Sequence, residues 1–256
     1  MAFYKKIKEK LYLLKQWVKL IFVYPKLKVH DASYDAYWQS RGLDSKVKLN
    51  SFQKKRVDLT LVYLDENSTI LDIGCGNGAL LAYLNRAKQM EKLIGVDVSE
   101  KALAFAKENN IETIKGDISS LEILEKLPLA DYILMFEVIE HFPNSEDLIK
   151  WAAKHAKKGV FFSVPNTGFF AHRLRLLLGR FPLQWRVNPS EHLRFWTVCD
   201  IKWWLRALGF ENYILEVYEG TPFLNKIWPS LFGQGIWVMI SPAEEPLHRG
   251  LLPARG

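Results

Sequence analysis

The 256-residue sequence is poor in cysteine, and its two cysteines, Cys75 and Cys199, exclude a disulfide framework. It also lacks an apolar run long enough to cross a bilayer, because Lys15 and Lys19 interrupt the apolar stretch near the N-terminus. No small-residue cleavage site follows that stretch, so we do not expect a secretory signal. Internal repeats and low-complexity stretches are lacking as well. With 49% apolar residues, the composition predicts an ordinary globular protein, and we expect a cytoplasmic one.

Most of the chain also lacks a surplus of charge of either sign. The formal net charge is +7, and residues 1–28 account for it with eight lysines against a single acid, Glu9. The remaining residues contain 27 basic and 27 acidic side chains. A nucleic-acid-binding protein with a basic body is therefore not supported.

The basic segment has the periodicity of an amphipathic helix. Apolar residues recur at spacings of three or four: Tyr4, Ile7, Leu11, Leu14, Val18 and Ile21. The helix could dock this stripe on the body, with its lysines in solvent. It could instead lie on an anionic membrane, with its lysines toward the lipid head groups. We assign residues 1–44 to this helix and to a short linker helix within 31–42.

From residue 69 onward, short β-rich runs alternate with stretches long enough for helices. The runs cover 69–74, 92–98, 111–118, 131–138 and 159–165, and two further runs follow at 211–220 and 234–241. Ser99 and Asn144 each precede a helical stretch and are expected N-caps. Alternation of this kind predicts a parallel sheet with helices on both faces and a ligand site beyond the carboxyl ends of the strands.

We expect one α/β domain over residues 45–242, followed by a loose tail at 243–256. An insertion rich in arginine and aromatic residues interrupts the domain at 165–196. Cys199 is expected on the buried face of a helix. His172 has no partner that the sequence reveals, and we expect it to be structural.

The motif LDIGCGNGALL is the strongest functional signal. Gly74, Gly76 and Gly78 follow a predicted strand and precede a helix, where the chain must turn sharply and let its backbone approach a ligand. The motif also satisfies the looser G-x-G-x-x-A pattern of dinucleotide sites. Asp72 argues against a dinucleotide, because a carboxylate beside the loop would repel a pyrophosphate. It would suit S-adenosylmethionine, which carries a sulfonium and an ammonium group and no phosphate.

Acidic residues end the next two strands. Asp97 lies 19 residues beyond Gly78, where a carboxylate can accept hydrogen bonds from ribose hydroxyls. Asp117 ends the third strand, at a position where it could bind an adenine amino group. Three acids at three successive strand ends favour a cofactor site more strongly than any one of them alone.

With LDIGCGNG, GVDVS, GDI and FEVIEH in this order and spacing, residues from about 45 to 240 resemble the class I S-adenosylmethionine-dependent methyltransferases. The resemblance implies a Rossmann-like seven-stranded sheet with helices on both faces and the last strand antiparallel. It also implies a set of cofactor-binding residues: Asp72, Gly74, Cys75, Gly76, Gly78, Asp97, Val98, Asp117, Ile118 and Glu137.

FEVIEH contains an E-x-x-E-H motif. It is similar to the motif that binds a divalent metal in small-RNA 2′-O-methyltransferases and ubiquinone-pathway O-methyltransferases, where a later histidine completes the site. The resemblance implies a Mg²⁺ or Mn²⁺ site formed by Glu137, Glu140, His141 and His192. Similar motifs also occur in methyltransferases that hold no metal. In that case His141 or His192 is the expected catalytic base.

The composition of the insertion indicates what kind of acceptor the site binds. Its arginines are expected to gather at the mouth of the site, mixed with aromatic residues: Arg173, Arg175, Arg180, Arg186 and Arg194, with Phe169, Phe170, Phe181 and Trp185. They could clamp an anionic small molecule, or they could simply solvate a helix. The function we expect is O-methylation of a small or membrane-associated acceptor.

Two other functions remain open. SVPNTGFFAHRLRLLLGRFP and WPSLFGQGIWVMI are similar to the MetW group of methionine biosynthesis. That similarity implies a non-catalytic or regulatory partner of homoserine O-acetyltransferase, although FEVIEH departs from the group's pattern. An RNA 2′-O-methyltransferase would fit E-x-x-E-H, but the neutral body counts against RNA as a partner.

Overall fold

The computed structural model describes residues 2–24, 49–184 and 192–241. Three sequence predictions lie outside the described residues: the linker helix within 31–42, the roles of Trp185 and Arg186, and the tail at 243–256. Among the helices of the described residues, none combines the length and the apolar character needed to cross a bilayer.

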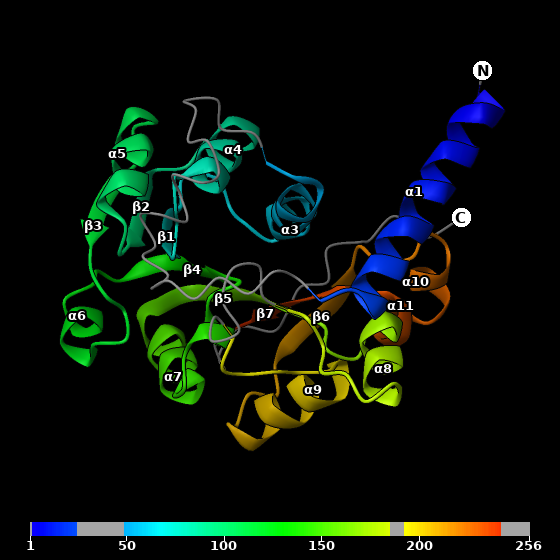
Figure 1. The fold of residues 1–256 in the computed structure, drawn as a ribbon. Helices are drawn as coiled ribbons and strands as arrows, with labels where there is room; N and C mark the ends of the chain where they lie inside the picture. The colour runs from blue at the N-terminus through cyan, green and yellow to red at the C-terminus, as the bar shows by residue number, and fades with distance from the viewer. Residues whose placement is uncertain (1, 25–48, 185–191, 242–256) are drawn as a thin grey trace.

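The described residues form one seven-stranded sheet (Figure 1). Its strands are β1 (Thr69–Ile73), β2 (Lys92–Asp97), β3 (Glu112–Lys115), β4 (Ala130–Phe136), β5 (Ala156–Pro165), β6 (Tyr213–Tyr218) and β7 (Gly235–Ile240). The order is β3-β2-β1-β4-β5-β7-β6, with β7 antiparallel to β5 and β6 and the other pairs parallel. The predicted Rossmann-like sheet with an antiparallel last strand is confirmed.

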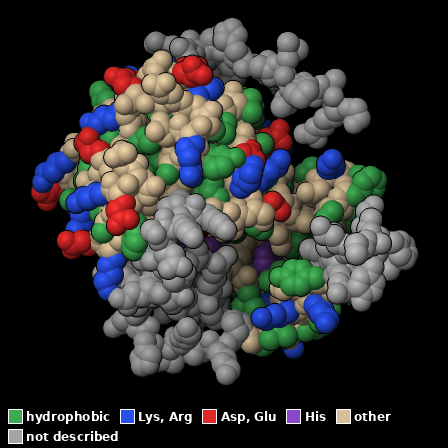
Figure 2. Space-filling model, turned by 90° about the horizontal axis from the view of Figure 1, so that it is seen from above, with side chains coloured by type: hydrophobic (Ala, Val, Ile, Leu, Met, Phe, Trp, Pro, Cys, Tyr) green, Lys and Arg blue, Asp and Glu red, His purple; other side chains and the backbone are tan. Residues whose placement is uncertain are grey.

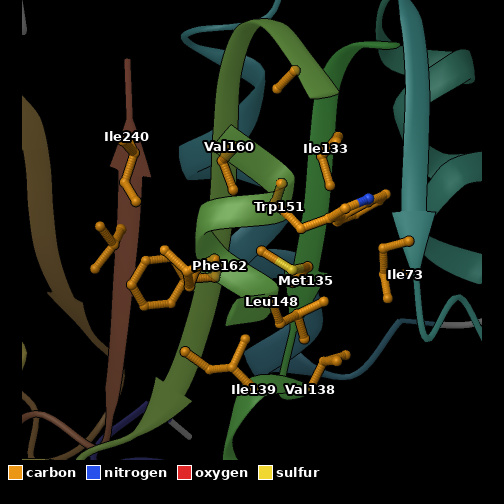
Figure 3. Close-up of a cluster of buried hydrophobic side chains, with 14 of the residues drawn as sticks. Ile73, Ile133, Met135, Val138, Ile139, Leu148, Trp151, Val160, Phe162 and Ile240 are labelled. Atoms are coloured by element: carbon orange, nitrogen blue, oxygen red, sulfur yellow. The ribbon is translucent and has the colours of Figure 1, made fainter. Parts of the chain in front are cut away.

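Helices cover both faces of the sheet, as predicted. One face carries α3 (Ser51–Leu61), α4 (Ala79–Ala87) and α5 (Glu100–Glu108), and the other carries α6 (Leu121–Glu125), α7 (Ser145–His155) and α9 (Val198–Ala207). The period of two along β4 explains how one strand serves both layers. Tyr132 and Leu134 pack toward α3, α4 and α5. Ile133 and Met135 pack toward α7, where they meet Leu148 (Figure 3).

The remaining helices gather at one end of the sheet, beside β6 and β7 (Figure 1). They are α1 (Ala2–Phe22), α8 (Phe170–Leu177), α10 (Leu224–Ile227) and α11 (Pro229–Phe232). A single 3₁₀ turn, η1 (Ile139–His141), follows β4.

The predicted N-caps differ in outcome. Ser99 caps α5, and its side chain accepts a hydrogen bond from the Ala102 amide. Asn144 occupies the N-cap position of α7 but makes no side-chain capping bond. The Ser145 hydroxyl instead ties the start of the helix to η1 by donating to the Ile139 carbonyl. The expectation that Cys199 is buried is wrong, because it lies on the exposed face of α9.

The strand order places a topological switch point between β1 and β4. The chain runs outward from β1 through β2 to β3, then returns to add β4 on the other side of β1. Connections on opposite sides leave a crevice at the carboxyl ends of these two central strands, where open α/β sheets bind their ligands. The glycine loop after β1 and the E-x-x-E-H segment after β4 therefore lie side by side.

Candidate functional site

The glycine loop joins β1 to α4 through three left-handed backbone positions. Gly74, Gly76 and Gly78 have φ values of 72°, 55° and 72°, a region that residues with a Cβ rarely adopt. A Cβ on Gly74 would lie 2.7 Å from the Val138 side chain, and one on Gly78 would lie 2.5 Å from Ile111. The loop thus needs glycine both for its conformation and for its close packing. It also contacts the segment that follows β4.

Two acids flank this loop. Asp72 is buried, and Asp97 accepts hydrogen bonds from the Gly76 amide at 2.8 Å and the Ser99 amide at 2.9 Å. Burial, and then the neighbouring Asp97 charge, raise the pKa of Asp72 well above its usual range. A cation bound beside Asp72 would relieve this cost. The ammonium and sulfonium groups of S-adenosylmethionine are cations of this kind.

The other predicted cofactor residues lie along the same edge. Val98 is half-buried, and Ile118 is buried just beyond β3. Asp117 is exposed, and its carboxylate accepts a hydrogen bond from the Ser119 amide at 2.9 Å. Cys75 is buried inside the glycine loop, and burial raises the pKa of its thiol well above the usual value. This thiol therefore stays protonated, and a nucleophilic role is not supported.

Glu137 begins the E-x-x-E-H segment in a strained conformation. Its φ is 56°, in the left-handed region that costs a side-chain-bearing residue on the order of 1 kcal/mol. Its carboxylate accepts a hydrogen bond from the Ser163 hydroxyl at 2.9 Å and pairs with the Arg56 guanidinium at 3.5 Å. Arg56 also donates to Ser163 at 3.2 Å. These contacts hold Glu137 at the crevice.

Arg56 and Ser163 are site residues that sequence reasoning missed. Arg56 is a buried residue of α3, and Ser163 belongs to β5. Burial lowers the pKa of Arg56, but the charges of Glu137 and other acids outweigh burial, so this pKa is raised overall. The sequence offers only a weak signal for Arg56, namely a single arginine on the face of α3 that packs against the sheet.

Glu140 and His141 of η1 come together with His192. One ligand atom of each lies within 4.8 Å of the others, and the two imidazole rings meet edge to face at 4.8 Å between centroids. The backbone explains how His192 reaches η1, because the Leu193 and Arg194 amides both donate to the Glu140 carbonyl. Glu137 does not belong to this group, so the structure unites three of the four predicted metal ligands.

The Glu140 carboxyl group is fully buried. Neither of its oxygens has a hydrogen-bond partner among the described residues. Burial, and then the charge of Glu137, raise the pKa of Glu140 well above its usual range. Buried polar atoms are nearly always paired, so an unpaired buried carboxyl group marks a place for a ligand or a proton. Figure 2, a view from above, shows histidine side chains in a hollow near the middle of the molecule.

The described arginines of the insertion do not form the predicted cluster at the mouth of the site, because their side chains bind other parts of the chain. Arg175, which is buried, donates from Nη1 to the Leu20 carbonyl at 2.8 Å and the Ile21 carbonyl at 3.0 Å. Arg180 donates to the Phe22 carbonyl. These two arginines therefore cap the carboxyl end of α1, whose last carbonyls lack partners within the helix.

The other described arginines of the insertion are also engaged within the chain. Arg194 pairs with the Glu146 carboxylate and donates to the Pro143 carbonyl at 2.7 Å. Arg173 donates to the Gly168 carbonyl at 2.7 Å. His172 is buried, and burial lowers its pKa to about 4. Its neutral ring fits the predicted structural role.

Docking of α1 is confined to its last turns. Ile21 is buried in a small cluster with Phe169 and Ala171, and Trp17 meets the Phe170 ring edge to face at 5.3 Å. Other members of the predicted apolar stripe are open, because the side chains of Leu11 and Leu14 are each 52% exposed and that of Val18 is 47% exposed. The docking interpretation therefore accounts for only one end of the helix.

Comparison with known proteins identifies the family of this site. The family profile described as a methyltransferase domain matches residues 46–215. The ubiquinone biosynthesis O-methyltransferase of Azoarcus sp. (strain BH72) is 34% identical over 167 residues, which cover 62% of this chain and 70% of that protein. A protein of the same name from Hydrogenovibrio crunogenus is 33% identical over 118 residues. That match covers 43% of this chain and about half, 48%, of the relative.

A solved structure shows the same fold. The chain is similar to a SAM-dependent methyltransferase from Archaeoglobus fulgidus, with a TM-score of 0.58 and 20% sequence identity. The match covers 82% of this chain and 100% of the other.

Proposed function

The chain belongs to the family of S-adenosylmethionine-dependent methyltransferases, and we propose that its acceptor atom is an oxygen of a small or membrane-associated molecule. The observation that carries the proposal is the buried Glu140 carboxyl group, unpartnered among the described residues and grouped with His141 and His192. The relatives named as O-methyltransferases support oxygen as the acceptor. A hydroxyl must lose its proton as it is methylated, and Glu140 with the two histidines can promote that loss.

The cofactor residues are proposed to act through position and charge. Asp72 would bind the ammonium group, and Asp97 would accept hydrogen bonds from the ribose hydroxyls at the end of β2. Asp97 already uses part of its capacity on the loop amides, and each carboxylate oxygen keeps a second lone pair for a ligand. When bound, S-adenosylmethionine supplies an electrophilic methyl group on a sulfonium. The remaining rate enhancement comes from holding the acceptor oxygen in line with that methyl group.

The donor set after β4 fits a divalent cation. Glu140 offers a carboxylate without a described partner, and His141 and His192 offer imidazole nitrogens within 4.8 Å of it. Mixed oxygen and nitrogen sites of this kind suit Mn²⁺ and related ions. Glu137, which is paired with Arg56, lies outside this donor set. When bound there, a divalent cation would lower the pKa of an acceptor hydroxyl and orient its oxygen.

Without a cation, one histidine can serve as the base. His141 or His192 would accept the hydroxyl proton, since the ordinary histidine pKa lies near neutrality. The two mechanisms differ in one observable. Metal removal abolishes transfer in the first and leaves it intact in the second.

Incubation with S-adenosylmethionine labelled in its methyl group and a metabolite extract tests the function. We expect the labelled methyl group to be bonded to an oxygen of a small or lipid-soluble product. Label in RNA would favour the RNA 2′-O-methyltransferase alternative. Cofactor binding without any labelled product would favour a regulatory partner in methionine biosynthesis, and binding to homoserine O-acetyltransferase would then test that role.

A further inference from the structure

We propose that the end of the molecule built from α1, α8, α10 and α11 is a surface that binds anionic membranes, here called the basic apolar end. It combines exposed apolar side chains with a strong excess of basic residues. It lies outside the cofactor crevice, and the inference goes beyond the proposed methyl transfer.

The four helices form one continuous structure. Trp17 of α1 contacts Phe170 of α8 at 5.3 Å, and Phe170 contacts Phe232 of α11 at 5.7 Å between ring centroids. Arg175 of α8 secures the carboxyl end of α1 through its backbone carbonyls. Beyond that junction α1 projects from the body (Figure 1). A rigid attachment therefore holds the helix away from the sheet.

Apolar side chains are exposed on three of these helices or directly beside them. On α1 they are Leu11, Leu14 and Val18, three of the six residues in the predicted apolar stripe. Leu177 of α8 is 81% exposed, and Phe223 beside α10 is 72% exposed. Exposed apolar groups gathered in this way mark an interaction surface.

Charge identifies the partner. The sequence of α1 contains six lysines and a single acid, Glu9, while Arg173 of α8 and Lys226 of α10 add exposed cations. Lys15 and Lys19 are exposed beside the open stripe of α1. The rest of the chain is electrically balanced, with 27 basic and 27 acidic residues beyond position 28. Apolar side chains flanked by lysines are the pattern of a helix that lies in the interface of an anionic bilayer.

The surface is connected to the crevice through the insertion. The Thr167 amide donates to the Trp196 carbonyl, so the insertion that carries α8 leaves and rejoins the carboxyl edge of the sheet at one place. His192 lies near the returning end of that segment. The same insertion therefore contributes α8 to the basic apolar end and His192 to the candidate site.

Vesicle flotation tests the proposal with the full chain. We expect binding to vesicles of phosphatidylcholine and phosphatidylglycerol in equal parts, weaker binding to pure phosphatidylcholine, and weakening by salt. Each lysine near an anionic surface contributes a factor of about five, so Lys15→Glu with Lys19→Glu should lower the partition coefficient at least roughly 25-fold. Leu14→Glu with Val18→Glu should also release the protein, because it removes the apolar insertion.

A matched control is Leu129→Glu, which replaces a leucine of similar exposure, 58%, just before β4 and far along the chain from the four helices. This variant should float like the wild type. Wild-type protein that ignores anionic vesicles overturns the proposal, as does equal flotation of the α1 variants. If light scattering shows a dimer that these variants dissociate while flotation is unchanged, the surface binds a second copy instead. Binding of S-adenosylhomocysteine should be unchanged in each variant, which shows that the variant is folded. Loss of flotation with intact binding therefore tests the membrane surface independently of the proposed methyl transfer.

Discussion

Two regions of this molecule bury an ionisable side chain, and they use it in opposite ways. Beyond β4, the Glu140 carboxyl group is fully buried and has no hydrogen-bond partner among the described residues. In α8, Arg175 is also buried, but two of its three guanidinium nitrogens donate to backbone carbonyls of α1 and of Phe181. A buried ionisable group with no described hydrogen-bond partner marks a place for a ligand, whereas one whose side chain bonds mostly to the protein itself holds structure together.

Glu140→Gln should give the largest effect. We expect methyl transfer to the labelled acceptor to fall by about 100-fold or more, since even the residues that support metal ligands are worth roughly 10- to 100-fold. The melting temperature should stay constant or rise, because the variant removes a buried carboxyl group without a described partner. A variant that transfers methyl normally and melts earlier would assign Glu140 to structure, and the contrast with Arg175 would fail.

Asp72→Asn comes next. It should weaken binding of S-adenosylhomocysteine by roughly 10- to 150-fold, the value of one hydrogen bond to a charged group. Calorimetric titration measures this loss. Asp97→Asn provides a comparison at the ribose position, where we also expect weaker binding.

The affinity for S-adenosylhomocysteine should increase with pH in the acidic range. In the free protein, burial and the charge of Asp97 raise the pKa of Asp72, so the carboxyl group stays protonated above the usual pKa of aspartic acid. The ligand's ammonium favours the ionised form, and binding therefore releases a proton. Asp72→Asn should flatten this dependence. A flat profile in the wild type would show that Asp72 does not bind the ammonium group.

Arg56→Lys should have a smaller effect, a loss of about tenfold in methyl transfer, as expected for a group that orients a site residue. Lysine keeps the charge but cannot reproduce the guanidinium geometry, in which Nη1 contacts both Glu137 and Ser163 while Nε donates to the Phe52 carbonyl. Cofactor affinity should change less than the rate of transfer. Equal losses in both would instead indicate a general disturbance of the crevice.

Arg175→Met should affect catalysis least. We expect unchanged transfer to a water-soluble acceptor, together with amide exchange at the end of α1 that is about tenfold faster or more, because the carbonyls of Leu20 and Ile21 lose a charged donor. Arg206→Met on α9, an exposed arginine, is the matched control. Loss of transfer in Arg175→Met would connect the helix junction to the chemistry and weaken the contrast between the two regions.

The sequence predicts most of the crevice because its signals are local. Three glycines that turn the chain after β1, and acids at successive strand ends, can be recognised without knowing which strands become neighbours. Arg56 cannot be recognised in this way, since its partner Ser163 lies 107 residues further along the chain. The prediction that the insertion's arginines bind the acceptor fails at Arg175 for the same reason. The carbonyls that Arg175 caps are 154 and 155 residues away, and no local pattern distinguishes such a cap from a ligand clamp.

The most direct test of the central claim is Mn²⁺ binding, followed by electron paramagnetic resonance in metal-stripped protein. We expect the wild type to bind one ion per chain, Glu140→Gln to lose the site and Arg175→Met to keep it. A wild-type protein that takes up no Mn²⁺ and still transfers methyl after exhaustive chelation would contradict the metal assignment. It would leave His141 or His192 as the base.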